Sequence, residues 1–171
     1  RWINPLGYVF TRQIDGEPVR VSQRGDWSWV GYSPAGVLHA IGQATDTPLL
    51  ESSPLQRLGD GGFARITDLD RALMPGHPPG MLAGPRVLDD GTIHSVLEDR
   101  GMQRVIAISP DGDVADVAEG PRLITGWDPT GSGASAVFTA TGPTQPGEVY
   151  RWDDSGEVPL TDLNGAFVAA A

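Results

Sequence analysis

The sequence lacks cysteine, so disulfide bonds, thiolate zinc sites and cysteine nucleophiles are excluded. Lysine is absent as well: all 12 basic residues are arginine, which beside abundant alanine, glycine and proline indicates the codon bias of a GC-rich genome. Long apolar runs are also missing, so we expect neither a membrane-spanning segment nor the apolar core of a secretory signal. A cytoplasmic location is the default expectation.

Basic charge is scarce. With 22 acidic residues against 12 basic ones, the formal net charge is −10. Nucleic-acid affinity depends largely on basic side chains that release counterions from phosphates, so no nucleic-acid partner is expected. The acidic pairs do not follow the spacing of a calcium-binding loop and are interpreted as turn residues; they are Asp89-Asp90, Glu98-Asp99 and Asp153-Asp154. We expect no cofactor and no metal ion.

Glycine and proline are what the sequence has in abundance. The 23 glycines and 15 prolines are spread through the chain and separate apolar stretches of strand length. No segment of domain size shows the spacing of an amphipathic helix. This pattern predicts an all-β fold.

Two series of turns recur at nearly regular intervals. The glycines of the first series are 45, 51 and 44 residues apart, at Gly16, Gly61, Gly112 and Gly156. A second series precedes the last three of these glycines by 25, 21 and 25 residues, with turns at Ser33–Gly36, Asp89–Gly91 and Asp128–Gly131. Two hairpins in each repeat make four strands, and a repeat of this length with four strands is typical of a β-propeller blade.

The fold prediction is a partial β-propeller of about three and a half four-stranded antiparallel blades. The turns divide the chain into a half blade at 1–26 and blades at 27–71, 72–120 and 121–165. Because propellers close with about four to eight blades, this number leaves two open apolar faces. We therefore expect a fragment, or a chain that self-associates through the open faces.

Strands are expected wherever the turns leave an apolar stretch. Second strands fall at 37–41, 92–97 and 135–139, third strands at 7–11, 55–58, 103–108 and 148–152, and fourth strands at 63–69 and 158–163. Both fourth strands end in Thr-Asp-Leu after an isoleucine or a leucine, 94 residues apart. A 94-residue offset corresponds to two repeats.

The last repeat also carries a family resemblance. It reads Pro-Gly-Glu-Val-Tyr-Arg-Trp at 146–152 and Val-Pro-Leu-Thr-Asp-Leu-Asn at 158–164. This resembles the closing propeller blade of prolyl oligopeptidase-family serine peptidases, and most closely their acylaminoacyl-peptidase branch. Further segments are similar to bacterial members of that branch, namely 69–71 with 74–76, 87–91 and 98–101. The resemblance covers residues 60–165, whereas 1–59 share only the rhythm of turns, and no family strand is identified at Thr47–Leu50.

The resemblance implies a function without catalysis in this chain. In such peptidases the propeller caps an α/β-hydrolase domain of the same polypeptide, which holds the catalytic serine, aspartate and histidine. The propeller admits short or unfolded peptides. Residues 166–171 would then begin the linker to the hydrolase domain, and oligopeptides would be the substrate. The alternative is a stand-alone propeller that binds or scaffolds a partner; a small β-sandwich hydrolase would require the turn rhythm to be accidental.

No catalytic residue is identified in the sequence. The nucleophile motif Gly-x-Ser-x-Gly is absent, and the nearest string, at 131–135, is interpreted as a hairpin turn. Arg71 and Arg100 are the candidates for substrate gating, because a guanidinium fork fits a peptide carboxylate or carbonyl. The competing interpretation makes both of them ordinary ion-pair residues.

Histidine and tryptophan provide the remaining candidates. His39 and His94 each follow a turn glycine by three residues. A functional interpretation has two blades share one ligand, but structural roles are favoured without a third ligand. His77 is interpreted as a loop residue. Four tryptophans at or near strands are expected to pack between blades: Trp27, Trp29, Trp127 and Trp152. Trp27 and Trp29 are expected on the same strand face. Only solvent exposure of the rings would favour a platform for stacking a carbohydrate or a peptide.

Overall fold

The computed structural model describes residues 6–46, 53–71, 73 and 84–170. The chain divides into two compact units, Arg1–Leu73 and Met74–Ala171, and each is described here by itself. Some sequence-based predictions fall outside the described residues: the irregular loop at 47–50, the family-like segment at 74–76, and His77.

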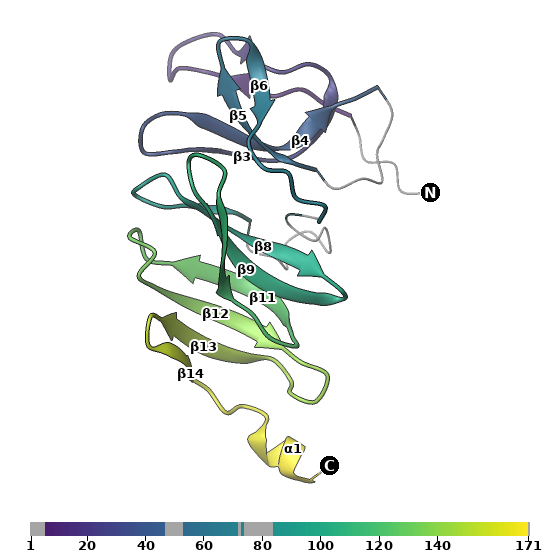
Figure 1. Ribbon diagram of the computed structural model, residues 1–171, viewed down its shortest axis with the longest axis vertical. Helices are drawn as coiled ribbons and strands as arrows, with labels where there is room; N and C mark the ends of the chain where they lie inside the picture. The colour runs from purple at the N-terminus through teal and green to yellow at the C-terminus, as the bar shows by residue number, and fades with distance from the viewer. Residues whose placement is uncertain (1–5, 47–52, 72, 74–83, 171) are drawn as a thin grey trace. The chain divides into compact units, whose positions relative to one another are not determined.

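The described residues of the first unit form two antiparallel sheets. A two-stranded sheet pairs β1 (Phe10–Thr11) with β2 (Val19–Arg20). A four-stranded sheet follows in chain order (Figure 1), with β3 at Gly25–Tyr32, β4 at Leu38–Ala44, β5 at Leu55–Gly59 and β6 at Gly62–Arg65. These sheets correspond to the half blade and the first full blade.

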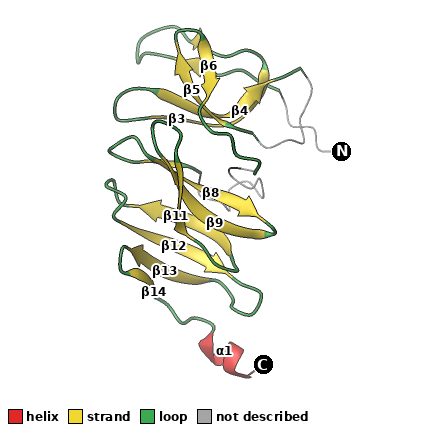
Figure 2. Cartoon of the chain, in the orientation of Figure 1, coloured by secondary structure: helices red, strands yellow, loops and turns green. Residues whose placement is uncertain are grey.

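The second unit contains two more four-stranded antiparallel meanders. The first comprises β7 (Arg86–Val87), β8 (Ile93–Asp99), β9 (Met102–Ile108) and β10 (Val114–Ala118). The second comprises β11 (Leu123–Pro129), β12 (Ser135–Thr141), β13 (Glu148–Asp153) and β14 (Gly156–Pro159). The all-β prediction is confirmed (Figure 2), and most of the expected second and third strands lie within a residue or two of the observed ones.

One short helix was not predicted. Helix α1 (Gly165–Ala170) follows the last blade, in the segment expected to begin a linker. Within the described part of the chain, no helix is long and apolar enough to cross a membrane.

The turn between the first and second strand of each blade ends on a glycine with positive φ. Its N–H donates to the carbonyl three residues earlier, over 2.8–3.0 Å, at Ser33–Gly36, Leu88–Gly91 and Thr130–Gly133. The prediction of a turn at Asp128–Gly131 was therefore wrong by two residues. Asp128 and Pro129 remain in β11, where they pair with β12, so the chain reverses only after them.

The fourth strands end earlier than predicted, at Arg65 and Pro159 rather than at 69 and 163. A threonine explains both endings. The Thr67 hydroxyl accepts the N–H of Leu55 (3.2 Å), and the Thr161 hydroxyl accepts the N–H of Val149 (2.9 Å). The side chain thus replaces the backbone partner that the strand would have supplied. The Thr-Asp-Leu repeat in the sequence therefore marks one structural device used in two blades.

The two tryptophans of β3 lie on opposite sheet faces, so the prediction of a shared face was wrong. Trp27 pairs with Gly42 and Trp29 with the adjacent Ile41, because a β-bulge inserts Ser28 between them. The Ser28 hydroxyl donates to the Ile41 carbonyl (3.2 Å). Neither ring is fully exposed, since both tryptophans are half-buried.

The core of the second unit lies between its two blades. Trp127 is 3% exposed, and its ring centroid lies 5.7 Å from Phe138 and 5.9 Å from both Trp152 and His94. Val96 and Val105 of the preceding blade belong to the same apolar cluster. Packing of Trp127 and Trp152 between blades is thus confirmed, and aromatic rings of this size dominate the burial energy of such interfaces.

Hydrogen bonds align the two blades at both ends. At one end the N–H of Asp89 donates to the Gly131 carbonyl (2.8 Å). At the other end the N–H of Gln103 donates to the Arg122 carbonyl (2.9 Å), while the Gln103 side-chain oxygen accepts the N–H of Ile124 (2.7 Å). The turns between the first and second strands of the two blades therefore lie side by side, and a second set of contacts joins the start of β9 to the start of β11.

Candidate functional site

The two arginines proposed for gating occupy different settings. Arg71 follows the first full blade and bonds the carboxylate of Asp70 (3.3 Å). Arg100 is an exposed residue of the tight turn between β8 and β9, with a φ of 53° followed by a positive-φ glycine. Arg71 belongs to the first unit and Arg100 to the second, so their joint role in gating stays a prediction.

The two strand histidines hold equivalent places in their blades. His39 and His94 are each 4% exposed, and each is the second residue of the second strand. Burial lowers the pKa of His94, an effect that Asp90 partly opposes, and burial is also the main cause of the lowered pKa of His39. Among the described residues neither Nδ1 atom has a hydrogen-bond partner. Two neutral, buried rings fit the structural interpretation.

Two of the three acidic pairs serve as turn residues. Glu98 and Asp99 are instead the last residues of β8, where they pair with β9, so their interpretation as turn residues was wrong. The Asp90 carboxylate accepts the N–H (2.8 Å) and the hydroxyl (3.0 Å) of Thr92, and the backbone bond is the main cause of its lowered pKa. Asp153 likewise accepts from the N–H and the hydroxyl of Ser155. Over the described residues no group of three histidine or acidic side chains is placed to hold a metal ion. The serine-containing string at 131–135 comprises part of the β11–β12 turn and the first residue of β12, so it lies in a hairpin as expected.

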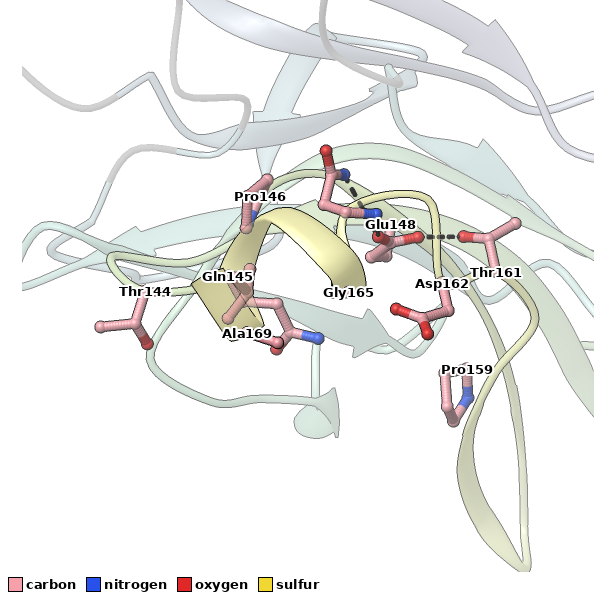
Figure 3. A pocket seen from close by; sticks show the side chains of 11 residues that line it. Thr144, Gln145, Pro146, Glu148, Pro159, Thr161, Asp162, Gly165 and Ala169 are labelled. Carbon is pink, nitrogen blue, oxygen red and sulfur yellow. Dashed lines mark hydrogen bonds between the residues drawn. The ribbon is translucent and has the colours of Figure 1, made fainter. Parts of the chain in front are cut away.

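A polar cluster surrounds Glu148, the first residue of β13. Glu148 is 5% exposed. One carboxylate oxygen accepts the Thr161 hydroxyl and the N–H of Leu163 (3.1 Å); the other accepts the N–H (3.0 Å) and the side-chain amide (3.2 Å) of Asn164. Four donors thus converge on two oxygens. In Figure 3 the Glu148 and Thr161 side chains point toward each other beside α1.

These bonds hold the Glu148 carboxylate in its charged form. Donation from the Thr161 hydroxyl, then from the Leu163 N–H, lowers the pKa of Glu148 below its ordinary value. A carboxylate with a lowered folded-state pKa stabilises the fold at pH values above the pKa of unfolded glutamate. This stabilisation is lost as the pH falls through the lowered pKa. The cluster is therefore intact at neutral pH.

A cavity of about 640 Å³ adjoins the cluster. It lies between the β12–β13 loop and the segment that leaves β14, and Figure 3 shows the residues that line it. Asn164 also donates its side-chain amide to the Gly147 carbonyl (3.2 Å), which fastens the same segment to that loop.

Sequence reasoning quoted all three partners but missed their interaction. Glu148, Thr161 and Asn164 are three of the polar residues in the two segments that carry the family resemblance. The available signal was the coincidence of three polar side chains in a short motif that flanks one β-hairpin.

Solved structures with the same fold include peptidases from three organisms. The propeller domain of the trilobed protease from Pyrococcus furiosus matches 89% of this chain and 42% of its own, at 20% identity and a TM-score of 0.65. Pyrococcus horikoshii acylaminoacyl peptidase matches 92% of this chain and 23% of its own, at 23% identity and 0.66. A Mycobacterium tuberculosis puromycin-hydrolyzing peptidase matches 85% and 23%, at 18% identity and 0.64. The chain is part of a β-propeller.

These similarities establish the fold and leave the activity to be tested. No protein-family model and no curated protein matches the sequence. The chain spans less than half the length of the three structural relatives, 42% in the first case and 23% in the other two. The partial β-propeller predicted from the turn rhythm is confirmed, with blades in both units.

Proposed function

We propose that this chain is the non-catalytic part of a serine peptidase of the prolyl oligopeptidase family, with closest affinity to the acylaminoacyl-peptidase branch. Its blades restrict access to an α/β-hydrolase domain in the same polypeptide, so that short oligopeptides reach the catalytic triad. We also propose that the parent is a cytoplasmic bacterial enzyme, and that Arg71 and Arg100 contact the peptide.

The observation that carries this proposal is the Glu148 cluster. The glutamate, threonine and asparagine of the family-like segments form one hydrogen-bonded unit at the point where the chain leaves its last blade. A stretch that only resembled the family by chance would have no reason to place these three side chains together. Structural similarity to three peptidases supports the same proposal at the level of the fold.

The test is active-site labelling of the complete gene product that contains this chain. A fluorophosphonate probe, which reacts with activated serines, is expected to label one serine outside residues 1–171, in a Gly-x-Ser-x-Gly motif. Residues 1–171 alone are expected to remain unlabelled and to show no turnover of a chromogenic acyl-peptide. A folded gene product that takes no label, or a gene that stops shortly after Ala171, would contradict the proposal and favour a stand-alone binding propeller.

A further inference from the structure

The two blades that share the Thr-Asp-Leu repeat differ in what surrounds the threonine. Counting 94 residues back from the Glu148 cluster gives Thr67 for Thr161, Pro54 for Glu148 and Asp70 for Asn164. The backbones of the two blades are equivalent at this point. The N–H of Ile66 donates to the carbonyl of Leu55, as the N–H of Leu160 donates to the carbonyl of Val149. The threonine is therefore common to both blades, whereas the carboxylate and the asparagine amide occur only in the last blade.

This difference coincides with a difference in the path of the chain. After Thr67 the described residues reach Arg71 without forming a helix, and Asp70 pairs with its neighbour Arg71. After Thr161 the chain turns into α1, whose first backbone bond joins the N–H of Val168 to the Asn164 carbonyl (2.9 Å). Glu148 binds both Leu163 and Asn164 immediately before this helix. The carboxylate thus fixes the segment at the point where it leaves the propeller.

We infer that Glu148 is a positioning residue that sets the direction in which the chain leaves the last blade. The inference rests on the proposed function, in which the chain beyond α1 enters the hydrolase domain. While Glu148 holds residues 161–164, the exit segment, the propeller stays over the hydrolase domain. When the exit segment is released, the propeller and the hydrolase domain separate further. Glu148 thereby controls the size of the peptide that is admitted, without touching it.

The chemistry of the site explains why a neutral residue would not suffice. All four contacts to the carboxylate are donors, so each oxygen must act only as an acceptor. In Glu148→Gln one oxygen becomes an NH₂ group that faces two donors. Partly buried donors that face an NH₂ group lose their acceptor, so the segment 161–164 is expected to detach from Glu148.

The experiment compares the complete gene product with its Glu148→Gln variant. Two substrates share one scissile bond, a short acyl-peptide and a long unstructured peptide, and kcat/KM is measured for both. The ratio of kcat/KM for the long peptide to kcat/KM for the short peptide does not depend on the fraction of enzyme that is folded. We expect the variant to raise this ratio on the order of fivefold. Thr67→Val is the matched control: it removes the equivalent threonine but no exit contact, and leaves the ratio at the wild-type value.

Amide hydrogen exchange supplies a readout that does not depend on peptidase activity. In the wild-type protein the amides of Leu163 and Asn164 are expected to be protected at neutral pH and to lose protection in acid, as Glu148 is protonated. If Glu148→Gln does not fold, Thr161→Val replaces it, with a smaller change of ratio in the same direction.

The outcomes separate the two proposals. An active wild type whose long-to-short ratio is unchanged by Glu148→Gln overturns the positioning role, as does free exchange of the Leu163 and Asn164 amides at neutral pH. A folded wild type that cleaves neither substrate overturns the proposed function instead.

Discussion

At the scale of single residues, Arg122 illustrates how one side chain joins several parts of the second unit. Its guanidinium binds both carboxylate oxygens of Glu157 on β14, donates to the Glu119 carbonyl (2.7 Å), and lies 5.0 Å from the centroid of Phe138. The side chain is only 15% exposed. A planar fork with several donors can make these contacts at once, which an ammonium group cannot.

Arg122→Lys is therefore expected to destabilise the second unit by about 1–3 kcal/mol, the scale of charge-assisted hydrogen bonds. Arg104→Lys is the matched control, because Arg104 pairs with Asp116 (3.2 Å) at a more exposed place, where the two side chains are 32% and 50% exposed. That change should cost less than about 1 kcal/mol. Urea titration followed by tryptophan fluorescence measures both variants; equal losses would contradict the role of Arg122.

His94 shows how burial makes one residue sensitive to pH. Its folded-state pKa lies below the ordinary 6.5, so the unfolded chain binds a proton first as the pH falls. The fold is therefore fully stable with respect to this group above pH 6.5, and loses stability below it. His39 follows the same trend in the first unit.

Two measurements check this expectation for His94. Its imidazole should titrate below pH 6.5 by NMR, and the melting temperature of the wild type should fall as the pH is lowered through that value. His94→Leu keeps the ring site apolar and should show a smaller fall, because the remaining slope comes from His39 and the carboxylates. An imidazole pKa at or above 6.5, or an unchanged slope in the variant, would falsify the account of His94.

At the scale of strands and turns, much of the architecture could be predicted, because local chemistry fixes where the chain reverses. Positive-φ glycines such as Gly36 and Gly91 are recognisable from sequence, and the strands follow between them. The bulge at Ser28 could not be predicted, since it depends on pairing with β4, and it reversed the face of one tryptophan. The Glu148 cluster depends likewise on residues 13–16 positions apart meeting in space.

The turn at Gly133 tests whether a turn also depends on its contact with the preceding blade. Gly133 has a φ of 73°, and an added methyl group would lie 2.6 Å from Leu88 and 3.6 Å from His94. Gly36 has a similar φ of 77° with open space around it. Gly36→Ala should cost about 1–2 kcal/mol through the backbone alone. Gly133→Ala should cost about 1–3 kcal/mol more through overpacking. Equal costs in urea titrations would show that the blade contact at Gly133 is unimportant.

At the scale of the whole molecule, the far face of the last blade remains partly open. Val137 is 47% exposed. It pairs with Asp128 of β11 as the buried His94 pairs with Arg86 of β7, so the two residues hold equivalent positions in their blades. Val158 (43%) lies in register with Val137, because both pair with Arg151 of β13, and Leu160 is 52% exposed. A propeller blade is normally covered by its neighbours, so this exposure is consistent with a chain that represents part of a larger propeller.

The central claim, that these blades restrict access to a peptidase, is tested most directly by the length dependence of hydrolysis. The complete gene product is assayed on peptides of increasing length with one scissile bond, and on a folded protein that carries this bond in a surface loop. We expect kcat/KM to fall steeply with length and the folded protein to remain intact. Equal rates at every length, or a folded gene product that cleaves none of the peptides, would contradict the claim.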